Sequence, residues 1–189
     1  MQTRSAAMLR GAVAGLVAAT VLVLWFLVID LLAGRPFQTP RVLASSVFGV
    51  EQATVDSRLL VLYTALHYIV FVAIGAIVAF VIRAARLGGG FLFGLFIGLF
   101  LFDAMFYLSV VVTGVNVVER LGWPAVLFGS LLAGTSLALT LRLLGLTHGT
   151  RLAPALREHP VLRDGIISGL LAAAIVALWF LTIDIAFRG

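Results

Sequence analysis

The chain has 189 residues, of which 62% are hydrophobic and only 11% charged, and its mean hydropathy is +1.19. A soluble domain contains about 45–50% apolar and about 25% charged residues, so this chain has too little polar surface to cover a fold in water. We therefore predict an integral membrane protein that is surrounded by lipid. The chain contains no cysteine, which excludes disulfides, thiolate metal sites and covalent c-type haem.

The net charge of +5 comes from thirteen cations that are all arginine. They lie at the ends of apolar segments, where membrane topology and lipid headgroups explain them. No basic cluster with interleaved aromatic residues occurs, so we expect no nucleic-acid partner. The use of Arg without Lys, together with abundant Ala, Gly, Leu and Val, is typical of a GC-rich bacterial genome and favours a bacterial inner-membrane location.

Five segments are long and apolar enough to cross a bilayer, for which a helix needs about 20 residues. They are residues 9–33, 59–82, 90–112, 121–144 and 165–187. Backbone groups in lipid have to be satisfied within their own segment, which makes these spans helices. The first apolar run exceeds the roughly 7–15 residues of a signal peptide, so we expect it to be retained. The prediction is a single all-α domain over 1–189, a bundle of five transmembrane helices.

The arginines indicate the orientation of this bundle. Eight of them fall on one side of the predicted membrane and five on the other. The richer side is cytoplasmic by the positive-inside rule. We therefore expect a cytoplasmic N-terminus and a C-terminus outside.

The two longest loops are expected to contain short helices that lie in the membrane interface. In the outer loop, Thr39 can cap a helix, Pro40 suits its first position and Gly49 can end it. Its apolar residues recur on one side: Leu43, Val47 and Val50. The loop over 147–163 is expected to hold a second such helix.

The first and last spans repeat each other. Gly-x-x-x-Gly-Leu-x-Ala-Ala begins at Gly11 and again at Gly165, and Leu-Trp-Phe-Leu-x-Ile-Asp ends at Asp30 and again at Asp184. Both copies run in the same direction through the predicted membrane, so this is a parallel repeat. One interpretation is a partial duplication that supplies a second helix for a similar groove. The other is a pseudo-symmetric pair of aspartate-bearing helices beside a site.

Small residues at a spacing of four mark a close-packing side on four of the five spans, because helices in lipid associate where their backbones can approach. The glycines of these stripes are Gly11, Gly15, Gly90, Gly94, Gly98, Gly134, Gly165 and Gly169. The stripes predict a compact bundle. They serve contact with another subunit, or with a second copy of the chain, equally well.

Ionisable residues inside the spans are the candidates for a ligand site or an ion pathway. Asp103 lies near mid-membrane, where an ionised carboxylate costs several kcal/mol unless it is paired or hydrated. Tyr107 lies one turn further on the same side. Asp30 and Asp184 lie near the outer boundary and point toward packed protein.

His67 lies inside the second span with Tyr63 and Phe71 one turn to either side. As a structural residue it would hydrogen-bond a neighbour, for which Asp103 and Asp30 are the expected partners. As a functional residue it would be the single ligand of a haem or pigment. We predict no cofactor, because His148 and His159 lie at the opposite membrane surface, about 25 Å away.

No metal site and no catalytic constellation are predicted. A zinc-protease His-Glu-x-x-His, a Gly-x-Ser-x-Gly elbow and a phosphate-binding glycine loop are all missing from the sequence. The protein is therefore not expected to be an enzyme.

Two classes of function remain, with the single-histidine haem or pigment subunit as a third alternative. The first is a structural or accessory subunit of a larger membrane protein complex. The second is a small transporter, channel or proton-coupled carrier that uses Asp103 and His67. The two differ in whether Asp103 conducts or holds the assembly together.

Overall fold

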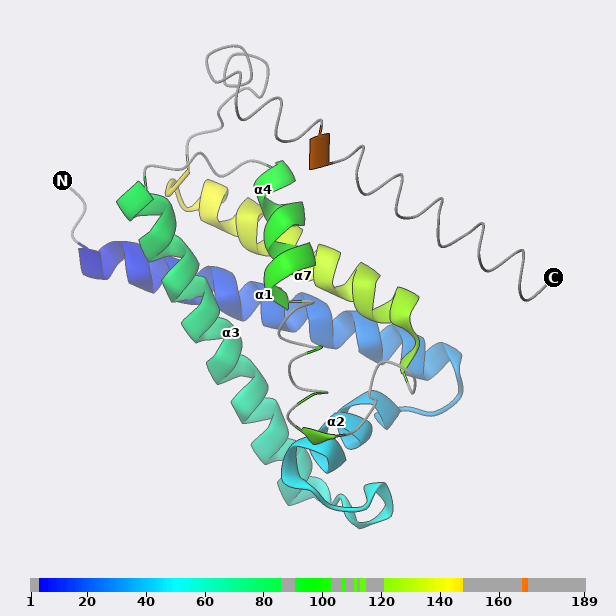
Figure 1. The fold of residues 1–189 in the computed structure, drawn as a ribbon. Helices are drawn as coiled ribbons and strands as arrows, with labels where there is room; N and C mark the ends of the chain where they lie inside the picture. The colour runs from blue at the N-terminus through cyan, green and yellow to red at the C-terminus, as the bar shows by residue number, and fades with distance from the viewer. Residues whose placement is uncertain are drawn as a thin grey trace. The chain divides into compact units, whose positions relative to one another are not determined.

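The computed structural model describes residues 4–85, 91–102 and 121–147, with the isolated positions 107, 111, 113–114 and 168–169 (Figure 1). The chain divides into two compact units, Met1–Gly149 and Thr150–Gly189. The described part is helical and contains no strand, which confirms the predicted all-α class for these residues. The predicted fifth span and the predicted helix in the loop over 147–163 lie almost entirely outside the described residues.

Three described helices are long and apolar enough to cross a membrane: α1 (Arg4–Leu32), α3 (Ser57–Ala85) and α7 (Trp123–Leu143). They correspond to the first, second and fourth predicted spans. Asp56 precedes α3, and its Oδ1 accepts the backbone N–H of Leu59 at 2.9 Å, which caps the helix.

The predicted third span starts as helix α4 (Phe91–Phe96) and continues as the π-helical segment η2 (Ile97–Phe102). Such wider turns are rare and short, and they frequently occur at functional sites. Most of the remaining predicted span, including Asp103, lies outside the described residues.

Glycines hold α1 and α3 together in an antiparallel pair. A Cβ built on Gly11 would come within 3 Å of Gly75 and Ala79, and one built on Gly15 would come within 3 Å of the backbone of Phe71. Each step of four residues forward along α1 is matched by four residues backward along α3. Because lipid gives no hydrophobic drive for association, this backbone approach is what lets the two helices gain dispersion contacts.

Two hydrogen bonds at opposite ends fix α7 antiparallel to α1. The guanidinium of Arg10 donates to the backbone oxygen of Leu144 at 2.8 Å, at the C-terminal end of α7. The indole N–H of Trp25 donates to the backbone oxygen of Ala125 at 2.8 Å, near the other end. The first bond also places a cation where the dipole of α7 is negative.

The segments α4 and η2 pack on α7 through glycines as well. A Cβ on Gly94 would come within 3 Å of Ala138, and one on Gly98 would come within 3 Å of Ser130. A Cβ on Gly134 would collide with the backbone of Gly94 and Gly98. Helix α7 therefore has α1 and α4 as close neighbours.

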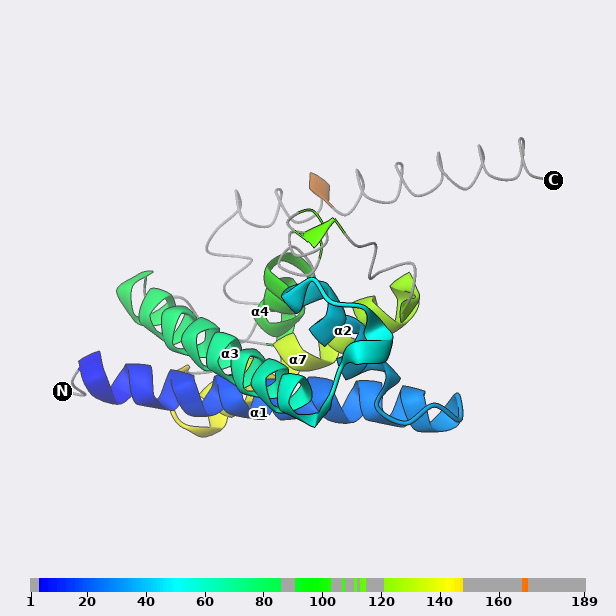
Figure 2. The ribbon, with the colours of Figure 1, turned by 90° about the horizontal axis from the view of Figure 1, so that it is seen from below.

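Helices α1 and α3 are close near the N-terminal end of α1 and diverge toward the other end (Figure 1). Helix α2 (Gln38–Phe48) lies between their separated ends, and α2, α3 and α4 lie on one side of α1 in Figure 2. The buried apolar core forms where the helices are close. Its larger members are Phe71, Ile74, Val78, Ile82, Ile97, Leu137 and Leu141.

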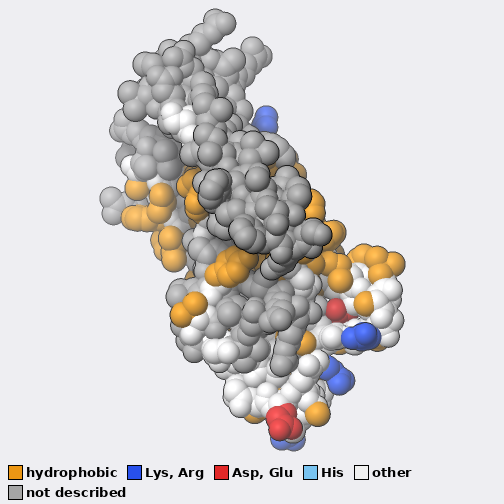
Figure 3. Space-filling view, turned by 45° about the vertical axis from the view of Figure 1, so that its right-hand side comes forward, with side chains coloured by type: hydrophobic (Ala, Val, Ile, Leu, Met, Phe, Trp, Pro, Cys, Tyr) orange, Lys and Arg blue, Asp and Glu red, His pale blue; other side chains and the backbone are white. Residues whose placement is uncertain are grey.

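Most of the apolar surface of these three long helices faces outward. Of the most apolar stretch of each helix, 28% is buried in α1, 33% in α3 and 44% in α7. Among the side chains that are coloured in Figure 3, few are charged, and most of these gather toward the lower end of the view. This surface is available for contact with lipid or with other membrane helices.

We expect Trp25→Phe to lower the free energy of unfolding by about 1 kcal/mol, because it removes the bond to the carbonyl of Ala125 but keeps an aromatic ring. Denaturation in mixed detergent micelles, followed by circular dichroism, measures the change. Trp123→Phe is the matched control, since Trp123 is 64% exposed. Equal effects of the two substitutions would contradict the role of the bond.

Candidate functional site

Asp30 joins the end of α1 to the start of α2. It is 5% exposed, and both of its carboxylate oxygens are used. Oδ2 accepts the backbone N–H of Thr39 at 2.8 Å, and Oδ1 accepts the hydroxyl of Thr39 at 2.7 Å. A carboxylate at a helix N-terminus also meets the positive end of the helix dipole. Asp30 is therefore the N-terminal cap of α2, although it lies nine residues away in sequence.

The expected capping role of Thr39 is wrong, because α2 starts before it. Phe37 precedes the helix, and its side chain does not cap α2. The N–H of Gln38 donates to the oxygen of Arg35, that of Thr39 goes to Asp30, and the next residue is a proline without an N–H. The first turn is thus satisfied from outside the helix. The end at Gly49 is as predicted, with a left-handed φ of 65°.

Helix α2 packs on the protein through a side that the sequence analysis did not identify. The buried residues include Val42, Ala44 and Ser45, whereas Val47 is exposed and Leu43 only half-buried. Small residues let the short helix enter the space between α1 and α3, where larger side chains would prevent its approach. The helix is therefore packed within the bundle on its small residues.

Phe37 adopts a left-handed backbone with φ 64° and ψ 20°. For a residue with a side chain this conformation costs about 1–2 kcal/mol relative to the right-handed one. Such strain persists only where the surroundings determine it, and it is found preferentially near ligand sites. The ring of Phe37 is 55% exposed and lines the cavity described below.

His67 is half-buried on α3 and packs among aromatic rings. Its Nε2 lies 3.4 Å from the backbone oxygen of Ala19, a long contact between α3 and α1. The expected bond between His67 and Asp30 is not formed, because His67 contacts α1 at Ala19, about three helical turns before Asp30. The rings of Tyr63 and Phe71 lie at centroid distances of 6.2 Å and 4.7 Å, as their spacing predicts.

A cavity of about 490 Å³ opens where α1 and α3 diverge. It is walled by α1, α2, α3 and α7, and most of its lining is apolar. Among the polar residues on its wall are Asp30, Thr39, Tyr63, His67 and Ser130. The cavity falls within the size range of small-molecule sites, which is about 300–1,000 Å³.

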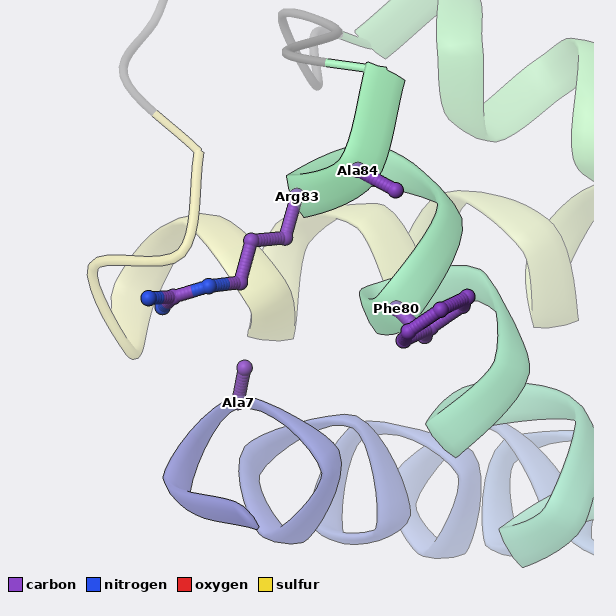
Figure 4. Close-up of a pocket in the computed structure, with 4 residues that line it drawn as sticks. All are labelled: Ala7, Phe80, Arg83 and Ala84. Atoms are coloured by element: carbon purple, nitrogen blue, oxygen red, sulfur yellow. The ribbon is translucent and has the colours of Figure 1, made fainter. Parts of the chain in front are cut away.

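A second cavity, of about 350 Å³, lies at the other end of α1 and α3. Ala7, Phe80, Arg83 and Ala84 line it, and the Arg83 side chain extends from α3 past Ala7 toward the end of α7 (Figure 4). Its position matches the arginine-rich side of the predicted membrane.

The structure thus brings together Asp30 and His67 on the wall of one cavity. Tyr107 is 49% exposed. The predicted roles of the other candidates remain predictions, since Asp103, Asp184, Gly90 and Gly165 lie outside the described residues. The described residues bring together no group of three potential metal ligands among His, Asp and Glu.

Sequence reasoning missed the capping bond of Asp30 and the two hydrogen bonds by which Arg10 and Trp25 bind α7. It also missed that Phe37 and Ser130 share a cavity with Asp30. A signal existed for Asp30: a carboxylate followed by a glycine turn and then a Thr-Pro helix start is compatible with capping across the turn. No family model, curated protein or solved structure matches the chain.

Proposed function

We propose that the chain is a multi-pass membrane protein of five spanning helices that acts as a structural or accessory subunit of a larger membrane protein complex. In this proposal it catalyses no reaction, and it lies in a bacterial inner membrane. The three described spanning helices, and the short segment that begins the predicted third span, support the membrane part.

One observation carries the structural role: the polar side chains of α1 are used to join helices. Arg10 and Trp25 bind the backbone of α7, and Asp30 binds the start of α2. Thr20 lies 3.2 Å from the hydroxyl of Tyr68 on α3. Groups that could have formed a polar path through the membrane are thus used for packing. The outward apolar surface of α1, α3 and α7 offers an area for further helices.

The helix directions support the proposed orientation. The start of α1 and the ends of α3 and α7 share one end of the packed helices, which collects Arg10, Arg83 and Arg142. With the arginine-rich end in the cytoplasm, the N-terminus is inside. Helix α2 and the cavity beside Asp30 then lie near the outer surface.

Native mass spectrometry of the protein, purified from its own membrane in mild detergent, tests the proposal. We expect a complex in which this chain and at least one other membrane protein occur in a fixed ratio. A monomer, or an oligomer of this chain alone, would contradict the accessory role. The carrier alternative keeps one supporting observation, the cavity that Asp30 and His67 share.

A further inference from the structure

Asp30 brings a negative charge to the cavity wall. Its two hydrogen-bond donors, the N–H and hydroxyl of Thr39, are neutral, and Asp30 forms no ion pair within the described part of the chain. The dipole of α2 offsets part of the charge, about half an elementary charge at most. A carboxylate offers about four acceptor positions, so two bonds leave capacity for another partner. Buried charges are normally paired, which gives the cavity a preference for a cation.

Aromatic rings surround the same space. Phe26 from α1, Phe37 from the turn before α2, and Tyr63 and Phe71 from α3 all line the cavity. The faces of such rings attract a cation within about 6 Å. Phe37 is held there in a left-handed backbone that glycine would adopt without strain. The Phe37 ring therefore lines the cavity although its position requires a strained backbone.

The rest of the lining selects against small hydrated ions. It is largely aliphatic, and no Arg or Lys is among the described residues that form it. The described residues bring together no group of three metal ligands there, whereas the aliphatic part of the wall packs well on apolar substituents. Ser130, which is only 4% exposed, adds a hydroxyl group to the lining from α7.

We propose that this cavity binds a lipophilic organic cation, such as a quaternary phosphonium or ammonium ion with apolar substituents. The positive centre is attracted by the Asp30 carboxylate and by the rings of Phe26 and Phe37. The apolar substituents occupy the aliphatic part of the cavity. This site belongs to the chain itself and does not depend on a partner subunit.

Two probes of the same shape and opposite charge test the site: tetraphenylphosphonium and tetraphenylborate. The full chain is placed in phosphatidylcholine nanodiscs, and empty nanodiscs correct for partitioning into lipid. We expect saturable binding of the phosphonium ion, measured by equilibrium dialysis, and no saturable binding of the borate. Saturable binding of both probes, or of neither, would overturn the proposal.

Variants then assign the binding to Asp30. Asp30→Asn removes the charge and keeps an oxygen acceptor for Thr39, and we expect it to weaken phosphonium binding at least about tenfold. Phe37→Leu should weaken it about threefold, as one lost cation–π contact would. Asp56→Asn removes a carboxylate at the exposed start of α3, outside the cavity, and should leave binding unchanged. Unchanged binding in Asp30→Asn would also overturn the proposal, and circular dichroism verifies that each variant is folded.

Discussion

Substitution of Gly75 by valine should separate α1 from α3 and lower the free energy of unfolding by about 3 kcal/mol, the upper part of the usual range for overpacking. A Cβ on Gly75 would collide with the oxygen of Gly11 and with the N and Cα of Gly15, which are all backbone atoms. No flexible side chain is available to move aside, so the helices themselves have to shift. Unfolding in mild detergent with increasing dodecyl sulfate, followed by tryptophan fluorescence, measures the loss.

Ala73→Val is the matched control for this substitution. Ala73 lies on the same helix two residues away and is exposed. The added methyl groups there meet the surroundings of the helix, so we expect a change within about 0.5 kcal/mol. A Gly75→Val protein as stable as Ala73→Val would show that α1 and α3 do not pack through their glycines.

Replacing Asp30 by alanine should cost about 2–3 kcal/mol, the second-largest effect we expect. The change leaves the N–H and hydroxyl of Thr39 buried without their acceptor, and an unsatisfied buried donor costs about 1–3 kcal/mol. It also removes a negative charge from the N-terminus of α2. The same detergent titration measures the loss, and hydrogen exchange locates it at α2.

A double-mutant cycle separates the bond from the packing. Thr39→Val removes only the hydroxyl bond and should cost about 1 kcal/mol. In the double variant with Asp30→Ala, this second substitution should cost almost nothing, because the bond is already lost. Additive costs would contradict the pairing. Asp56→Ala removes a local cap at the exposed start of α3 and provides a reference for an ordinary cap, about 1 kcal/mol.

The positions of three long apolar helices were predictable because a long apolar segment has few alternatives in a chain of this composition. The observed α1, α3 and α7 differ from the predicted limits by only a few residues at each end. The glycine spacing also indicated which residues would be approached closely. It could not pair Gly11 with Gly75, because the choice of partner depends on the packing of the whole bundle.

The candidate site was predictable only in part. Asp30 and His67 were identified because ionisable groups inside apolar segments need a reason to be there. Their hydrogen-bond partners could not be identified, since a carboxylate accepts a hydrogen bond from any nearby donor. For Asp30 that donor is Thr39 in the following helix. The apolar side of α2 was identified from its spacing, but hydropathy did not indicate that its small residues would be buried, because close approach between helices favours Ala and Ser.

The two hydrogen bonds between α1 and α7 have a consequence for how the protein is made. Helices α1, α2 and α3 leave the ribosome first, and their mutual contacts can form as soon as residue 85 has been inserted. Arg10 and Trp25, however, find their partners only after Leu144 has been synthesised. Until then a guanidinium and an indole N–H on the first helix lack their acceptors. A chain that stops before α7 therefore reaches the membrane with two polar groups of its first helix still without their partners in the folded protein.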